Sequence, residues 1–119
     1  STHEWVYFIR NLTAADAART PELDKTFGFS ASGNAEILSV WYVHVLRHAP
    51  QHAQAAAFKA SLERFLTGVG RRKFLMPAYR ALKETNQLAW AKSIYEQARP
   101  NYHAVARQSV DALLGWETL

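Results

Sequence analysis

The sequence predicts an all-α protein, and three observations support that prediction. Apolar residues recur at three- and four-residue spacing, as Trp5, Phe8 and Leu12 do, which is the period of an amphipathic helix. The alternation of apolar and polar residues that marks strands is nearly absent. Prolines and glycines divide the chain into about seven helical segments with short connections, so neighbouring helices should be antiparallel. We therefore expect a two-layered α–α superhelix of the armadillo or HEAT kind, with an orthogonal helical bundle as the alternative.

Local start and stop signals place the boundaries of these helices. Thr13 and Asp16 have the spacing of a capping box, and Asn34 is a typical N-cap residue. Gly28 is placed to end a helix, and Pro50 breaks the chain before the next one. The expected helices cover about residues 1–12, 13–27, 34–49, 52–67, 74–82, 86–98 and 105–114.

The composition is that of one folded helical domain over residues 1–119. Hydrophobic residues make up 49% and charged residues 20% of the chain, which excludes a disordered protein. The absence of cysteine excludes disulfides and thiolate metal sites. No run approaches the roughly 18 apolar residues that span a bilayer, so we expect a soluble protein, cytoplasmic or periplasmic, with no membrane partner. The chain opens at Ser1 directly on an amphipathic helix, which suggests a piece of a longer chain.

The net charge of +4 is unevenly distributed. Residues 1–60 hold five cations and five acids, whereas residues 61–119 hold nine cations and five acids. Between Arg64 and Lys83 there are six cations and no acid. Such a patch indicates an anionic partner or a solvated face. A basic module that binds nucleic acid and a helical-repeat scaffold for protein partners therefore both stay open as alternatives.

The stretch "GVGRRKFLMP", which ends at Pro77, places three cations where a helix is expected to begin. The start of a helix carries positive partial charge from its unpaired N–H groups, so cations there are locally unfavourable. Pro77 favours a helix that begins at about Phe74, because proline is tolerated in the first turn and kinks a helix further in. Arg71, Arg72 and Lys73 then lie in the turn before the helix.

These three cations and the neighbouring Gly70 predict an electropositive corner with free backbone N–H groups. Such a corner suits a carboxylate or a phosphate. The alternative is a solvated basic turn in which Arg71 pairs with an internal acid such as Glu36. The residues by themselves leave both interpretations open.

Histidines in the sequence do not complete a catalytic or metal motif. His3 and Glu4 begin the zinc-peptidase pattern H-E-x-x-H, but Tyr7 stands where its second histidine should be. His44 and His48 have the spacing of two ligands on one helix face, yet no third ligand is obviously placed near them. We therefore expect no catalytic residue and no metal ligand in this chain.

The segments "RFLTGVGRRKFLMPAYRAL" and "IYEQARPNYHAVA" resemble the C-terminal helical domain of the leukotriene A(4) hydrolase/aminopeptidase family of zinc metallopeptidases. "STHEWVYFIRNL" and "GNAEILSVWY" resemble that domain's earlier helices in the same order. The resemblance covers essentially the whole chain. Its most specific part is the pattern G-R-x-K-F-x-x-P, formed here by Gly70, Arg71, Lys73, Phe74 and Pro77.

The resemblance implies an armadillo-like superhelix that packs against a thermolysin-like catalytic domain of the same parent chain and helps to close its active-site cleft. That catalytic domain would carry the zinc ion and the catalytic residues, so this chain would be the non-catalytic C-terminal fragment of a larger aminopeptidase. Arg71 and Lys73 match the family residues that bind the free carboxylate of peptide substrates. Gly70, Arg72, which stands at the variable position of the pattern, and Glu36 are candidate supporting residues. No nucleic-acid partner is implied.

Overall fold

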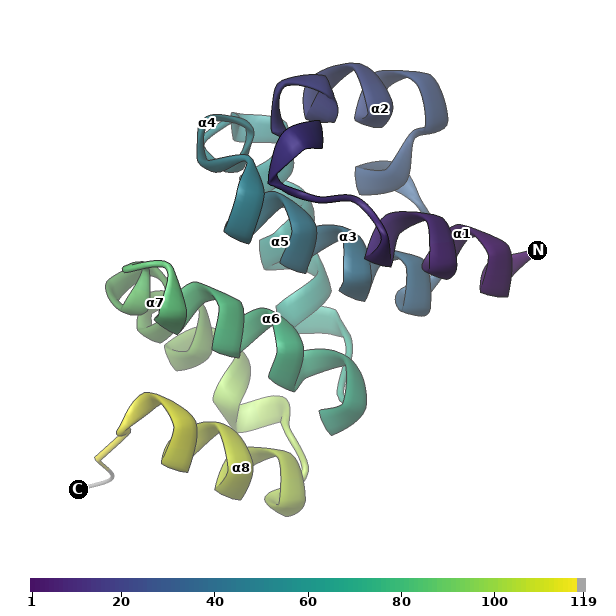
Figure 1. Cartoon of the computed structure of the whole chain (residues 1–119). Coiled ribbons are helices and arrows are strands. Elements are labelled where there is room, and N and C mark those ends of the chain that lie inside the picture. The colour runs from purple at the N-terminus through teal and green to yellow at the C-terminus, as the bar shows by residue number, and fades with distance from the viewer. Residues whose placement is uncertain (118–119) are drawn as a thin grey trace. The chain divides into compact units, whose positions relative to one another are not determined.

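The computed structural model describes residues 1–117, and every regular element in that range is helical (Figure 1). These residues form eight α-helices and three short 3-10 helices, which confirms the all-α prediction. The chain divides into two compact units, Ser1–Leu62 and Glu63–Leu119, called unit 1 and unit 2 below. Helix packs on helix within each unit, as the predicted α–α superhelix requires.

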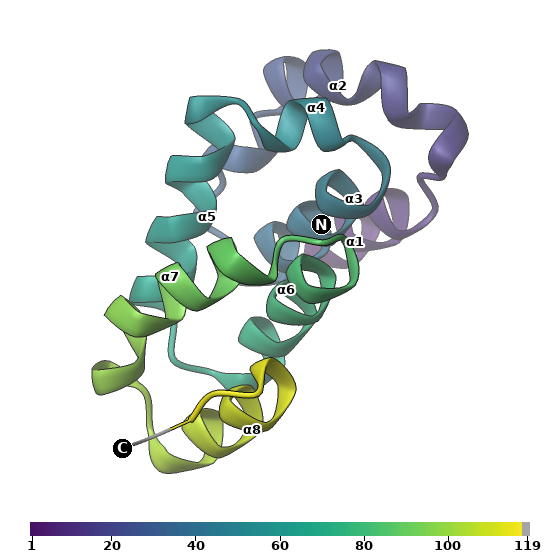
Figure 2. The same ribbon diagram turned by 90° about the vertical axis from the view of Figure 1, so that its left-hand side faces the viewer.

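Unit 1 is built around one buried helix. Its elements are α1 (Thr2–Arg10), η1 (Ala14–Arg19), α2 (Thr20–Phe27), η2 (Phe29–Ala31), α3 (Ala35–His48), α4 (Pro50–Ala53) and the first half of α5 (Ala56–Gly68). α3 packs against α1, η1, η2 and α4 (Figure 2). Trp41, Tyr42 and Val45 of α3 are completely buried, so α3 supplies the hydrophobic centre of this unit.

Unit 2 contains the end of α5 and three further α-helices. These are α6 (Arg72–Glu84), α7 (Leu88–Ala98) and α8 (Ala104–Leu114), with η3 (Arg99–Asn101) between the last two. α6 packs against both α7 and α8 (Figures 1 and 2). Leu75, Ala78, Tyr79 and Leu82 are completely buried at the i, i+3, i+4, i+7 spacing of one helix face. This face fixes the position of α6, whose first residues carry the predicted site.

Polar contacts hold the helices of unit 2 in register. The Tyr79 hydroxyl lies 3.0 Å from the Tyr102 hydroxyl, and Tyr102 in turn donates to the Leu66 carbonyl. Arg99 binds Asp111 with two hydrogen bonds of 2.9 Å, a two-pronged geometry that is among the stronger ion pairs. These bonds from Arg99 hold the pKa of Asp111 below its ordinary value. The ends of α7 and α8 are therefore tied to each other.

Two helix boundaries in unit 2 differ from the prediction. α6 begins at Arg72, with Arg71 as its N-cap, so the expected start at Phe74 was wrong. Pro77 then lies inside the helix, and it cannot donate the N–H that would normally bond to the Lys73 carbonyl. Asn86 was expected to open the next helix, but its φ of 63° and the 2.8 Å bond from Gln87 N to the Leu82 carbonyl make it the left-handed end of α6.

Two segments of unit 1 also divide further than the sequence indicated. The predicted helix over residues 13–27 is a 3-10 helix followed by α2, and Pro21 lies in the first turn of α2. Pro50 starts a short helix of its own, α4, which accounts for an eighth helix. The capping box at Thr13 and Asp16 and the N-cap at Asn34 are confirmed. Among residues 1–117, no helix combines the length and hydrophobicity that crossing a bilayer requires.

A buried histidine in unit 1 makes the stability of the fold sensitive to acid. His44 is 4% exposed, and its Nε2 lies 3.1 Å from the Thr20 hydroxyl. Its Nδ1 has no hydrogen-bond partner within the described residues. Burial, assisted by the nearby His48, lowers the pKa of His44 to about 4 from an ordinary value of 6.5, although Asp16 opposes the shift. His44 is therefore neutral in the folded protein at pH 7.

We expect the free energy of unfolding to fall as the pH drops from 6.5 towards 4. The unfolded chain protonates His44 near pH 6.5, whereas the folded chain resists protonation until about pH 4, so acid favours unfolding by up to roughly 3 kcal/mol. Urea titrations of wild type and His44→Gln at pH 7.5, 6 and 4.5 measure this contribution. The variant should lose stability less steeply than wild type, and parallel pH profiles would contradict the assignment to His44.

Candidate functional site

The predicted site lies where α5 gives way to α6. Gly70 and Arg71 are exposed in the connection, and Arg71 adopts the extended conformation of an N-cap residue with φ −76° and ψ 121°. Its carbonyl accepts the first helical bonds, from Phe74 N at 3.0 Å and Leu75 N at 3.1 Å. The Arg71 side chain makes no capping bond to this helix end within the described residues 1–117, which leaves the positive partial charge of the helix start unneutralised by its N-cap.

Arg71 and Lys73 approach the same aromatic ring. The Arg71 Cζ and the Lys73 Nζ each lie 5.5 Å from the centroid of the half-buried Phe74 ring. A cation over an aromatic face gains about 0.5–1 kcal/mol at an exposed site. The Phe74 ring is therefore a common contact of the two long side chains. We call them the Arg71–Lys73 pair.

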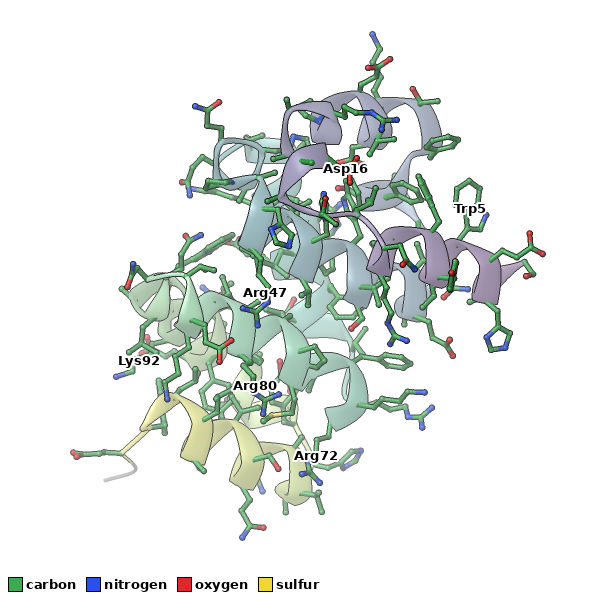
Figure 3. The ribbon with its side chains drawn as sticks, in the orientation of Figure 1. Trp5, Asp16, Arg47, Arg72, Arg80 and Lys92 are labelled. Carbon is green, nitrogen blue, oxygen red and sulfur yellow. The ribbon has the colours of Figure 1, made fainter. Side chains whose placement is uncertain are left out.

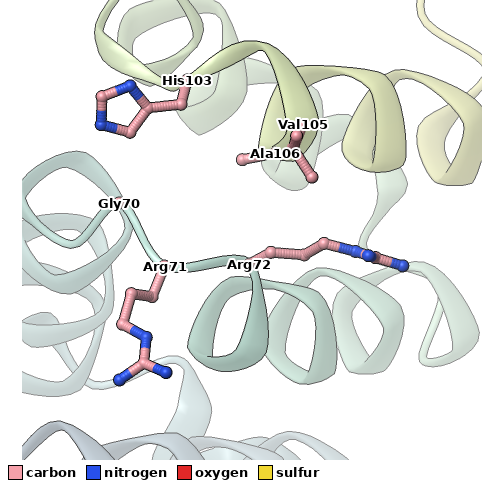
Figure 4. A pocket seen from close by; sticks show the side chains of 6 residues that line it. All are labelled: Gly70, Arg71, Arg72, His103, Val105 and Ala106. Carbon is pink, nitrogen blue, oxygen red and sulfur yellow. The ribbon is translucent and has the colours of Figure 1, made fainter.

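Arg72 takes a different direction from the pair. Figure 4 shows its side chain extending away from that of Arg71, along a pocket of about 360 Å³. The pocket is lined by Gly70, Arg71, Arg72, His103, Val105 and Ala106. His103 is the N-cap of α8 and, like Arg71 at α6, makes no side-chain cap bond. Two uncapped helix starts therefore share this pocket.

A second pocket, of about 570 Å³, follows one side of α6, and we call it the α6 pocket. Its lining residues are Arg71, Arg72, Lys73, Met76, Pro77 and Arg80. The five residues within the helix stand at i, i+1, i+4, i+5 and i+8, a spacing that places them on one face. Four of the six lining residues are cations and none is an acid, so the pocket is strongly electropositive.

No acid within residues 63–117 forms an ion pair with any of these four cations. Arg99 in the same unit is paired with Asp111, and Lys83 on α6 donates to the Leu113 carbonyl at 2.8 Å. Arg71 and Lys73 have only their contacts with Phe74 in that range. Within unit 2, therefore, no acid competes with an external anion for these two charges.

The structure adds two residues that the sequence interpretation did not select. Arg80 lies two helical turns after Arg72, a spacing that could have indicated a shared face. His103 reaches the site only because α8 packs against α6, which no local pattern reveals. Glu36, the third supporting residue of the prediction, belongs to unit 1. It lies half-buried in the first turn of α3, where its N–H donates to Asn34 at 2.9 Å.

The described residues do not fit a zinc site. Within residues 1–117, no group of three or more histidine, cysteine or carboxylate side chains comes close enough together to hold a metal ion. His3 and Glu4 are exposed on α1, and His44 is bonded to Thr20. What this arrangement can do chemically is bind and orient an anion, through a bidentate guanidinium and a lysine point charge.

Several known proteins are similar to this chain in sequence. The family described as "Leukotriene A4 hydrolase, C-terminal" matches residues 1–114. "Leucine aminopeptidase 2" of Neurospora crassa is 32% identical over 93 residues, which cover 78% of this chain and 13% of that protein. Proteins of the same name from Aspergillus niger and Neosartorya fischeri are 26% and 27% identical over 115 residues, covering 93% of this chain and 18% of each relative.

The chain thus spans less than a fifth of the length of these relatives. The match extends over α1 to α8 and includes the segment with the Arg71–Lys73 pair. The resemblance inferred from the residues is confirmed. The chain belongs to the leukotriene A4 hydrolase C-terminal family.

Proposed function

We propose that this chain is the non-catalytic C-terminal domain of a zinc aminopeptidase and that it binds the free carboxylate of peptide substrates. The observation that carries the proposal is the Arg71–Lys73 pair, held 5.5 Å from one aromatic ring and without an acid partner in residues 63–117. The names of the fungal relatives, which are leucine aminopeptidases, support the reaction class.

The role of the pair is to position the substrate. The planar guanidinium of Arg71 grips a carboxylate through two parallel hydrogen bonds, and Lys73 adds a point charge. Hydrogen bonds to charged groups contribute about 1.5–3 kcal/mol each when both partners are well placed. Holding the far end of a short peptide fixes the distance from that end to the first amide bond, which the catalytic domain would cleave. Gly70 is exposed beside the helix start, where an added side-chain carbon would meet no atom within 4 Å.

The rest of the parent chain would supply the zinc ion and the catalytic residues, and its catalytic domain would be the partner of this one. The shares of 13% and 18% that the chain covers in its relatives leave ample length for such a domain. In unit 1, Trp5, Tyr7 and Phe27 are 36%, 71% and 46% exposed. Exposed aromatic residues of this kind are typical of an interface, which supports a docked partner.

Metal removal tests the enzyme class. We expect the full-length protein that contains this chain to release the N-terminal residue from Ala-Ala-Ala. Incubation with 1,10-phenanthroline should abolish the release, and added zinc should restore it, because the metal activates the attacking water in such enzymes. A protein that keeps its full activity after the chelator has removed its metal would contradict the zinc assignment.

Capping the substrate tests the carboxylate site. We expect kcat/KM for Ala-Ala-Ala to exceed that for its C-terminal amide by about tenfold or more, since the amide loses the charge that the pair binds. The difference should shrink at high salt, which screens exposed charges. Equal hydrolysis of acid and amide would rule out recognition of the carboxylate.

The nucleic-acid alternative finds less support in unit 2. Modules that bind single strands combine a basic groove with exposed aromatic rings on which bases stack. Near these cations Tyr79 is completely buried, and the half-buried Phe74 ring is contacted by Arg71 and Lys73. Affinity that falls steeply with salt for an oligonucleotide, with no effect of peptides, would favour that alternative.

A further inference from the structure

Arg72 and Arg80 lie in the same pocket as the Arg71–Lys73 pair but take no part in the proposed grip on the terminal carboxylate. Resting on that proposed function, we propose that Arg72 and Arg80 bind an acidic side chain on the C-terminal residue of the substrate. The α6 pocket would then select peptides that end in glutamate or aspartate, with these two arginines as specificity-determining residues.

The arrangement of the cations supports two subsites. Arg71 and Lys73 lie at the Phe74 ring, whereas the side chain of Arg72 extends away from that of Arg71 (Figure 4). Arg80 follows Arg72 by eight residues, about 12 Å along the helix, and Figure 3 shows both side chains along the same edge of α6. The long side chains of arginine can converge over such a span.

The charge of the pocket also exceeds what one carboxylate needs. Four cations and no acid line it, and two of them suffice for the terminal carboxylate. Within residues 63–117, the side chains of Arg72 and Arg80 make no hydrogen bond or ion pair, in contrast to that of Arg99, which binds Asp111 at 2.9 Å. A second carboxylate would relieve the repulsion among the remaining cations and would gain charge-assisted hydrogen bonds.

The shape and floor of the pocket suit a dicarboxylic residue. Its volume of about 570 Å³ lies in the range of small-molecule sites. Met76 and Pro77 are half-buried between the cations and form an apolar floor. The methylene groups of a glutamate side chain can lie on that floor, and the flexible Met76 side chain can adapt to them. The two carboxylates of the residue would then face different pairs of cations.

Four tripeptides separate this inference from the proposed function. The full-length protein is assayed with Ala-Ala-Glu and Ala-Ala-Gln, each as the free acid and as the C-terminal amide. The ratio of kcat/KM for the glutamate and glutamine peptides tests the subsite formed by Arg72 and Arg80, because the two side chains have nearly the same shape and differ in charge. The ratio of kcat/KM for the free acid and the amide tests whether the Arg71–Lys73 pair binds the terminal carboxylate.

We expect wild type to prefer the glutamate peptide by about fivefold to tenfold in kcat/KM at low ionic strength, mainly through KM. The double variant Arg72→Gln/Arg80→Gln should reduce that preference to about one, by lowering kcat/KM for the glutamate peptide more than for the glutamine peptide. Arg64→Gln is the matched control, since Arg64 is exposed on α5 and lines neither pocket. The control should keep the preference. Circular dichroism checks that each variant is folded. If the double variant does not fold, the single variants Arg72→Gln and Arg80→Gln are assayed in its place.

Equal hydrolysis of the glutamate and glutamine peptides by wild type would overturn this inference, and so would a preference that survives loss of both arginines. If acid and amide are hydrolysed equally while the glutamate preference depends on Arg72 and Arg80, the second subsite stands and the carboxylate grip of the proposed function fails. If none of the four peptides is hydrolysed, both are overturned.

Discussion

Replacing Arg71 with alanine is expected to lower kcat/KM for a tripeptide by about a hundredfold, because loss of a positioning contact misplaces the scissile bond. The same variant should hydrolyse an aminoacyl anilide at the wild-type rate, since that substrate has no carboxylate for Arg71 to hold. The side chain is exposed, and within unit 2 it contacts Phe74 at 5.5 Å, so its removal should leave the helix intact. Assays with both substrates in parallel measure the effect.

Arg64→Gln should change neither rate, which controls for a general loss of positive charge in this part of the chain. If Arg71→Ala slows both substrates equally, Arg71 supports the fold or an interface. If it slows neither, the three cations are a solvated turn and the site assignment is wrong.

Replacing Tyr79 with alanine is expected to destabilise unit 2 by about 3–5 kcal/mol, as other aromatic truncations in a core do. Tyr79 is completely buried on the inner face of α6, and its ring centroid lies 5.7 Å from that of Tyr95. The truncation leaves a cavity and also removes the hydroxyl that lies 3.0 Å from that of Tyr102. Urea unfolding of wild type and variant gives the difference.

Tyr79→Phe isolates the hydroxyl from the ring. Tyr102 keeps its bond to the Leu66 carbonyl, so we expect this variant to lose only about 1 kcal/mol. Similar losses for the alanine and phenylalanine variants would show that packing of the ring contributes little, contrary to the packing described for α6.

Local signals were enough to predict most of the fold. The capping box at Thr13 and Asp16 and the N-cap at Asn34 act through bonds between neighbours in the chain, so the sequence reveals them directly. The left-handed end of α2 at Gly28, with φ 65°, follows from the freedom of glycine. These positions needed no knowledge of tertiary packing.

The start of α6 shows where local reasoning fails. Pro77 alone favours a later start. Burial of the face that includes Leu75 and Tyr79 stabilises a longer helix, however, and offsets the loss of the one backbone hydrogen bond that Pro77 cannot donate. Tertiary packing therefore outweighed a local preference of about 3 kcal/mol. Asn86 was misplaced for a related reason, because the same residue type serves at both ends of helices.

The candidate site, like the fold, could be predicted from the sequence only in part. The sequence indicated Arg71, Arg72 and Lys73 because they are adjacent in the chain. In the structure Arg71 and Lys73 contact Phe74, which distinguishes this pair from Arg72. His103 enters the site only through the packing of α8 on α6. Contacts between distant segments depend on the whole fold, and a single sequence carries no direct signal for them.

A double-mutant cycle between protein and substrate tests the central claim most directly. It combines wild type and Arg71→Ala with Ala-Ala-Ala as the free acid and as the C-terminal amide, in the full-length protein. If Arg71 binds the carboxylate, removing either partner makes removal of the other nearly harmless, and the coupling energy is about 1.5–3 kcal/mol. If Arg71→Ala lowers kcat/KM by the same factor for acid and amide, the two do not interact, and the chain does not recognise its substrate in the way proposed here.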